Sequence, residues 1–357
     1  MSKLQRIYSK METMGLRQML VSDPIAIFYI SGKWIFPGER FLGLLLKKDE
    51  TPILFFNELF KFDEDISVKK VYLKDTDDIT NILSHFIIKD APLGVDKILP
   101  ARFLLPMMSA NLATSFVNAS ICIDETRAIK DAAEIEKMRI SSKINDKAMD
   151  RFKKLVKKDI SEIEIADQML AIYKELGAQA FSFDPIVAFG KNAADPHHMP
   201  DETVLKEGDC VLFDVGCKFE NYCSDMTRTF FYKKNPTELE KKVYETVKRA
   251  NIEAEEMLKP GIVISNIDKK ARDIISLEGF GDMFTHRLGH FIGIEDHEYG
   301  DVSSTNDNIT CRGNIFSIEP GIYYSGVVGV RIEDLVLITD SSYEVLNSYS
   351  KDLEIIE

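Results

Sequence analysis

Two pairs of acidic residues lie within apolar, strand-like segments of the second half of the chain, and they constrain the fold more than any other feature. Asp214 follows the apolar residues 211–213, and Asp225 precedes the strand-like segment MTRTFF. The polar stretch KFEN between them predicts a turn. If this hairpin is symmetric about residues 219 and 220, Asp214 and Asp225 face each other with Cβ atoms about 4.5–5.5 Å apart.

The same pattern recurs with Glu319 in SIEPGIYY and Glu333 in VRIEDLVLI. A hairpin centred on Gly326 places these two residues opposite each other. A single acidic residue in a strand is usually exposed to solvent, but like charges opposed on neighbouring strands are destabilising, and buried unpaired carboxylates cost more. Two such pairs therefore favour a buried metal site, in which two divalent cations about 3.5–4 Å apart would offset the four charges.

Five of the six histidines fall in two groups near these pairs. His197 and His198 stand in PHH, and His286, His290 and His297 stand in HRLGHFIGIEDH. We expect one of them to be a metal ligand and others to handle protons. No HExxH motif is present, so a helical zinc site is not supported, and Gly289 and Gly293 favour strand or loop here. Oxygen and imidazole donors without cysteine suit Mn²⁺, Co²⁺, Zn²⁺ or Fe²⁺ and do not select among them.

The composition predicts a soluble protein of two domains. The 357 residues are 45% hydrophobic, which is enough for two cores, and the net charge of −13 disfavours nucleic acid and anionic membranes as partners. The N-terminus lacks the apolar core of a signal peptide and no apolar run could span a bilayer, so we expect a cytoplasmic location. The five cysteines show no CxxC spacing, which predicts reduced thiols.

Helical and strand patterns alternate over residues 1–123, which predicts a small α/β domain. The segments QMLV, FLGLLL, PILFF and KKVYL are its strand candidates. Near residue 124 the pattern changes, and Asp131 with Glu134 predicts a capped start of a long helix. We therefore place a domain boundary there.

The pattern of residues 124–357 predicts two helices, then strands, then two more helices and further strands. After the helix that starts at Asp131, helices are predicted from Ser161 to Gly177, from Pro236 to Pro260 and over 265–278. This order predicts an antiparallel sheet with helices on one face and the polar site on the other.

Several motifs together resemble a known family. FDVG, SDMTRTF, HRLGHFIG, SIEPGIY and VRIED stand in the order and spacing of the pita-bread-fold metallopeptidases (M24), specifically Xaa-Pro dipeptidases (prolidases) and aminopeptidases P. MGLRQMLVSDPIAIFYISG resembles the start of their creatinase-like N-terminal domain. The resemblance implies an α/β (α+β) protein with a small creatinase-like domain at 1–123. A pita-bread domain at 124–357 would carry a curved antiparallel sheet covered by helices.

The resemblance also implies roles for the five residues of the predicted metal site. Asp225 and Glu333 would bridge two divalent cations, Asp214 would bind one of them, and His290 with Glu319 would bind the other. Mn²⁺ is the first expectation, with Co²⁺, Zn²⁺ or Fe²⁺ as alternatives. A hydroxide bridging the metals would attack the peptide, and Glu319 would carry protons during attack and departure of the amine.

Four further residues receive roles from the resemblance. His197 and His297 would bind the substrate carbonyl or stabilise the oxyanion that forms from it. His286 would favour proline after the scissile bond. Arg331, which alternates onto the same strand face as Glu333, would support either the metal site or the substrate carboxylate.

The implied activity is hydrolysis of Xaa-Pro bonds in small peptides by a homodimer. An Xaa-Pro dipeptidase is the first interpretation, and an aminopeptidase P acting on longer Xaa-Pro-Yaa peptides is the alternative. A metal-free creatinase-like hydrolase and a non-enzymatic peptide-binding relative are less consistent with five intact metal-ligand positions.

Overall fold

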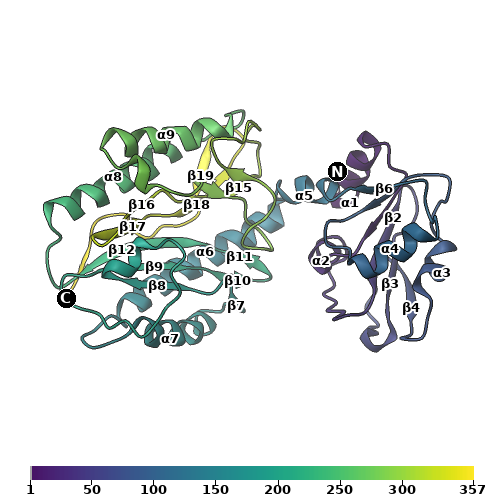
Figure 1. Ribbon diagram of the computed structural model, residues 1–357, viewed down its shortest axis with the longest axis horizontal. Helices are drawn as coiled ribbons and strands as arrows, with labels where there is room; N and C mark the ends of the chain where they lie inside the picture. Colours follow the sequence, from purple (N-terminus) through teal and green to yellow (C-terminus); the bar gives the residue numbers. More distant parts are fainter. Residues whose placement is uncertain (1) are drawn as a thin grey trace. The chain divides into compact units, whose positions relative to one another are not determined.

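The computed structural model describes residues 2–357, which divide into two compact units (Figure 1). One unit extends to Thr126 and the other is Arg127–Glu357. Each unit has a hydrophobic core of its own. Among the described residues, none of the helices combines the length and apolar character needed to cross a membrane.

The N-terminal unit is built on a six-stranded mixed sheet in the order β4-β3-β2-β1-β5-β6. Its strands are β1 (Gln18–Val21), β2 (Leu42–Lys47), β3 (Ile53–Asn57), β4 (Lys69–Leu73), β5 (Leu93–Val95) and β6 (Phe116–Asn118). Its helices are α1 (Lys3–Thr13), α2 (Pro24–Ser31), α3 (Ile79–Ser84), α4 (Ala101–Ser109) and α5 (Ile121–Arg127), with a 3₁₀ turn η1 (Glu58–Phe60). The first four strands are the segments predicted from apolar runs, and β3 is buried along its whole length.

Two pairs of helices cover the strands of the C-terminal unit. They are α6 (Ala132–Lys153) with α7 (Glu162–Glu175), and α8 (Glu238–Glu255) with α9 (Ile264–Leu277). Capping boxes at Asp131 and Ser161 begin α6 and α7 as predicted. The predicted limits of α8 were wrong: Thr237 caps its start, and the helix ends at Glu255, before Pro260. Because Pro260 disfavours helical backbone at Lys259, the helix has to end before that residue.

The strands of this unit form several short, mostly antiparallel sheets. They are β7 (Ala180–Phe181), β8 (Ile186–Phe189), β9 (Cys210–Val215), β10 (Cys217–Phe219), β11 (Tyr222–Cys223), β12 (Met226–Tyr232), β13 (Gly289–His290), β14 (Asp301–Val302), β15 (Ile315–Ile318), β16 (Gly321–Tyr324), β17 (Val328–Arg331), β18 (Asp334–Ile338), β19 (Tyr343–Val345) and β20 (Ile355–Ile356). A 3₁₀ turn η2 (Gly190–Ala194) lies between β8 and β9, and a second, η3 (Gly281–Met283), lies between α9 and β13. The strands lie between α8 and α9 on one side and α7 on the other (Figure 1). The predicted fold class is confirmed.

The predicted register of the first acidic hairpin was wrong. In β9 and β12, Asp214 pairs with Thr227 and not with Asp225. The turn is centred one residue later than predicted, because Glu220 and Asn221 both adopt the left-handed conformation, with φ of 45° and 69°. Asp225 stands two residues before Thr227, a spacing that keeps both side chains on one face. Asp214 and Asp225 are therefore diagonal neighbours.

The predicted register of the second acidic hairpin is confirmed. Ile318 pairs with Asp334 between β15 and β18, and Gly321 pairs with Arg331 between β16 and β17. Glu319 and Glu333 occupy the gap between these two paired segments, directly opposite each other. A single turn at Gly326, with a φ of 75°, sets both registers.

Candidate metal centre

A cavity of about 610 Å³ in the C-terminal unit brings together all the site residues predicted from the sequence. These are Asp214, Asp225, His290, Glu319, Glu333, His197, His286, His297 and Arg331. They come from strands and loops that span more than a hundred positions of the sequence. His198 does not line this cavity.

The five expected metal ligands stand on strands or directly beside them. Asp214 belongs to β9 and His290 to β13, whereas the other three lie at the ends of strands. Gly289 allows β13 to lie against β15, because a Cβ at this position would be 1.9 Å from the Ser317 carbonyl oxygen. The His290 N–H donates to Ser317 Oγ (3.0 Å), which fixes this strand at the site.

Three buried oxygens of the expected ligand carboxylates accept no hydrogen bond from residues 2–357: Asp214 Oδ1, Asp225 Oδ1 and Glu333 Oε1. Asp225 and Glu333 are 3% and 1% exposed. Ligand atoms of Asp225, His290 and Glu333 all lie within 4.8 Å of one another. Burying charged oxygens without partners is costly, so the donor set fits a divalent cation, and Asp214 and Glu319 can complete the coordination.

Crowding and burial shift the pKa values of Asp225, Glu333 and Glu319. Burial, followed by the charge of Glu333, raises the pKa of Asp225 well above its usual range. Burial, followed by the charge of Glu319, does the same to the pKa of Glu333. Burial also raises the pKa of Glu319 to about 7, although Arg331 opposes this shift. Cations bound among these groups would favour their ionised forms.

Arg331 holds one of the expected metal ligands in place. Its Nη2 donates to Asp214 Oδ2 (2.6 Å), and its Nε donates to the Thr227 hydroxyl (3.1 Å). The Thr227 hydroxyl in turn donates to Glu333 Oε2 (2.7 Å). Arg331 is 3% exposed. Of its two expected roles, these contacts favour support of the metal ligands.

The three histidines expected to act on substrate line the cavity at different depths. His286 is held from both sides, because its Nδ1 lies 2.7 Å from the Arg287 carbonyl oxygen and its Nε2 lies 2.8 Å from the Tyr323 hydroxyl. Burial, followed by the charge of Arg331, lowers the pKa of His286 to about 4, so its ring is neutral near pH 7. His197 and His297 are more exposed, as a role in contacting substrate requires.

Two residues near the centre were not predicted from the sequence. Tyr323 bridges Arg331 Nη1 (2.8 Å) and His286. It lies four residues after Glu319 on the same strand face, so strand alternation could have identified it. Asp296 also lines the cavity. It lies in an irregular loop, where no periodic pattern of the sequence could have identified it.

A second group of possible metal-binding side chains, Glu162, His198 and Asp201, has a different character. Both Glu162 oxygens are already occupied as acceptors. Oε1 accepts from Phe189 N (2.7 Å) and Asn192 Nδ2 (3.0 Å), and Oε2 lies 2.6 Å from His198 Nε2. This group therefore needs no cation to satisfy its buried carboxylate.

Comparisons with known proteins cover both units of the chain. The family described as "Metallopeptidase family M24" matches residues 136–340, and "Creatinase/Prolidase N-terminal domain" matches residues 3–129. An uncharacterized peptidase of Staphylococcus aureus (strain USA300) is 36% identical over 357 residues. That alignment covers 98% of this chain and 100% of the relative.

Solved structures resemble the whole chain. A recombinant prolidase from Thermococcus sibiricus is 34% identical, with a TM-score of 0.91 and 99% of each chain covered. An X-Pro aminopeptidase from Thermotoga maritima MSB8 is 26% identical, with a TM-score of 0.84, and the comparison covers 98% of this chain and 100% of that one.

Proposed function

The chain belongs to metallopeptidase family M24, and from this premise we propose that it is an Xaa-Pro dipeptidase that works with two divalent metal ions. It is a peptidase with small peptides as its substrate class. The proposal adds the specificity for proline, the number of metals and the roles of the individual residues.

The observation that carries this proposal is the set of buried carboxylate oxygens without partners beside His290. Asp214, Asp225 and Glu333 each direct one such oxygen into the cavity region. With Glu319 opposite Glu333, four carboxylates share a small volume in a cavity lined by two arginines. Arg331 contacts Asp214, whereas the Arg287 guanidinium is directed to His297. Four carboxylates exceed the charge of the two guanidinium groups, and this excess matches a dinuclear site better than a single ion.

Metals bound here would activate water for attack on the peptide and polarise the scissile carbonyl. The surrounding side chains perform the remaining tasks. Glu319, whose carboxylate lies opposite Glu333 at this centre, can accept a proton and return it to the departing amine. Arg331 keeps Asp214 in place, and His197 and His297 contact the substrate from the more open part of the cavity.

The uncharged and firmly held side chain of His286 supports the proposed preference for proline. An Xaa-Pro bond has no N–H, so a site for it must recognise shape and the carbonyl group. His286 is fixed by Tyr323 and by backbone, and it packs edge-on to Phe284 with ring centroids 5.1 Å apart. These contacts give a defined surface against which a pyrrolidine ring can pack.

An aminopeptidase P acting on Xaa-Pro-Yaa peptides is the second candidate. The likeness to the Thermotoga maritima X-Pro aminopeptidase favours it, whereas the higher identity to the Thermococcus sibiricus prolidase favours the dipeptidase. The proposal further includes Mn²⁺ as the first metal and a homodimer, both of which derive from the family resemblance, and a cytoplasmic location.

The test is an assay on matched peptides with protein that has been stripped of metal and reconstituted with Mn²⁺. We expect Ala-Pro to be cleaved much faster than Ala-Ala, and faster than the tripeptide Ala-Pro-Ala, with release of free proline. The metal-free protein should be inactive. Metal content is measured on the same sample by elemental analysis.

Faster cleavage of Ala-Pro-Ala than of Ala-Pro would move the assignment to aminopeptidase P. Equal rates on Ala-Pro and Ala-Ala would contradict the specificity for proline. Full activity of the metal-free protein would contradict the metal mechanism.

A further inference from the structure

Asp296 is a carboxylate at the metal centre in addition to the five expected ligands. It lies in the loop that joins β13 to β14, six residues after His290. Its side chain is 19% exposed and lines the same cavity as the metal-ligand residues. Asp296 Oδ1 is buried and accepts no hydrogen bond from the described residues. In this respect it resembles Asp225 and Glu333.

Nearby donors do not satisfy this carboxylate. Its Oδ2 lies 3.4 Å from His297 Nε2, which is longer than an ordinary hydrogen bond. The Arg287 guanidinium is directed to His297 Nδ1 instead, at 3.3 Å. Glu298, two residues further on, shows the contrast, because Lys130 and Arg127 neutralise it.

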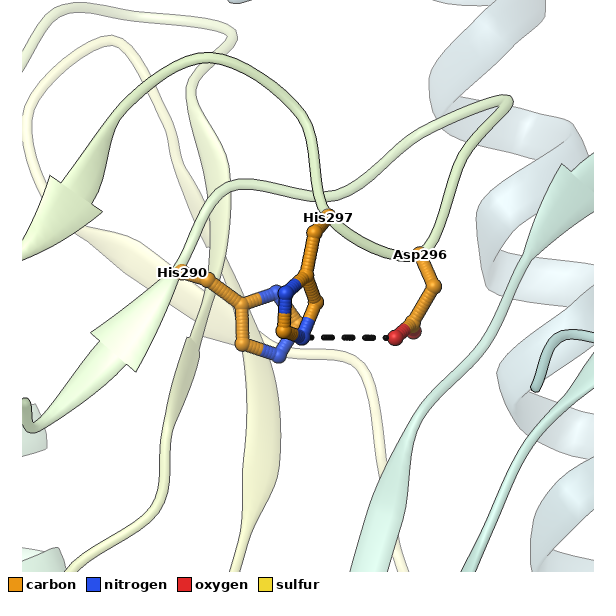
Figure 2. A group of neighbouring side chains, drawn as sticks. All are labelled: His290, Asp296 and His297. Atoms are coloured by element: carbon orange, nitrogen blue, oxygen red, sulfur yellow. Dashed lines mark ion pairs between the residues drawn. The ribbon is translucent and has the colours of Figure 1, made fainter. Parts of the chain in front are cut away.

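The geometry places Asp296 beside the expected ligand His290. Ligand atoms of His290, Asp296 and His297 all lie within 4.8 Å of one another. Figure 2 shows the Asp296 carboxylate directed toward the two imidazole rings, whose centroids are 4.0 Å apart. His290 belongs both to this group and to the group with Asp225 and Glu333. Asp296 therefore adds a carboxylate to the same centre from the loop between β13 and β14.

We propose that Asp296 is a sixth protein ligand, which binds the metal ion held by His290. The proposal rests on the dinuclear site proposed above and adds one oxygen donor to it. An extra carboxylate raises the coordination number, which favours oxygen-preferring ions such as Mn²⁺ over the four-coordinate Zn²⁺. Coordination by Asp296 would also fix the loop that carries His297 to the metal centre.

The first test measures metal binding directly. Mn²⁺ is titrated by calorimetry into metal-free wild-type protein and the Asp296→Asn variant, which keeps the size of the side chain and removes its charge. We expect the wild-type protein to bind two ions and the variant to bind one of them about tenfold or more weaker, as even residues behind the ligands affect metal affinity by about 10–100-fold. Asp296→Glu should recover part of the affinity.

The matched control is Glu295→Gln, which changes the neighbouring acidic residue of the same loop. Glu295 pairs with Arg127 and does not line the cavity, so both ions should bind this variant as they bind the wild type. Equal Mn²⁺ affinities of Asp296→Asn and wild type would overturn the proposal while leaving the dinuclear site intact. A wild-type protein that binds no divalent ion would instead contradict the proposed function itself.

A second variant separates direct coordination from an indirect effect. In Asp296→Cys, a thiolate bound to Co²⁺ gives a near-ultraviolet charge-transfer band that oxygen ligands do not give. The wild-type Co²⁺ protein, which contains all five native cysteines, should lack this band. Appearance of the band in the variant supports direct coordination, and a spectrum identical to that of the wild type contradicts it.

Discussion

At the scale of single residues, buried charges in the C-terminal unit are of two kinds. Some are matched by protein cations, as Asp334 is by Arg228 (2.7 Å). Among residues 2–357, others such as Asp225 form no ion pair with a lysine or arginine and lie beside His290 (3.5 Å). The first kind holds the fold together, whereas the second kind makes a metal site, because only an added cation can compensate these charges.

Glu255 is a buried charge that is matched by a protein cation, and it leads to a prediction about how stability depends on pH. It contacts Lys351 (2.6 Å), yet burial, followed by the charge of Asp334, raises its pKa from 4.5 to about 7. The folded protein therefore binds more protons than the unfolded chain between these values, and its stability falls as pH rises through this window. Between pH 4.5 and 7 the wild type should lose up to about 3 kcal/mol more unfolding free energy than Glu255→Gln.

Urea unfolding of the metal-free proteins at several pH values measures this difference. Glu256→Gln is the matched control, because Glu256 is the exposed neighbour at the end of α8, and it should keep the pH dependence of the wild type. Parallel pH profiles of Glu255→Gln and wild type would refute the prediction.

At the scale of elements, the start of α7 holds the segment that carries His197. Glu162, the first residue of this helix, is fully buried, and the hydrogen bonds of its carboxylate are with residues 189–201. His198 is one of these contacts. This histidine, to which the sequence assigned no role, therefore belongs to the support of the segment rather than to the cavity.

Replacing Glu162 should loosen this segment. Glu162→Gln puts an amide donor where the carboxylate accepted hydrogen bonds, and we expect a loss of about 1–3 kcal/mol in the free energy of unfolding. Amide hydrogen exchange of residues 190–201 should become faster. Glu164→Gln on the same helical turn is the control, since glutamine also completes a capping box. Unchanged exchange in Glu162→Gln would show that other contacts hold the segment.

At the scale of the whole molecule, the residues of the metal centre all belong to one of the two units. The other unit, up to Thr126, has its own sheet and core. Metal binding should therefore stabilise residues 127–357 in particular. The effect follows from mass action, and at a free ion concentration one hundred times the Kd it amounts to about 2.7 kcal/mol per site.

The single tryptophan makes this prediction measurable. Trp34 stacks on Phe28 in the N-terminal unit, with ring centroids 4.4 Å apart, so its fluorescence reports on the unfolding of that unit. Mn²⁺ should raise the Tm observed by far-UV circular dichroism more than the Tm observed by Trp34 fluorescence. In Asp225→Asn both shifts should shrink. Equal shifts by both probes in the wild type would contradict selective stabilisation.

The sequence by itself determined the helices, most of the strands and the chemical character of the site. Capping residues such as Ser161 and apolar periodicity act over a few positions, so the helices and most strands could be predicted locally. The register around Gly326 followed in the same way. The family motifs identified nine cavity residues, because ligands of one metal site keep their type and order along the chain.

Only the tertiary structure decided the remaining features. The pairing of Asp214 with Thr227 depends on the left-handed conformation of Glu220 and Asn221, which the sequence pattern did not predict. Asp296 lies in a loop whose course is set by packing between distant segments. The side chain of Glu162 finds hydrogen-bond partners up to 39 positions away. Such contacts arise from burial in three dimensions, for which a periodic pattern along the chain carries no signal.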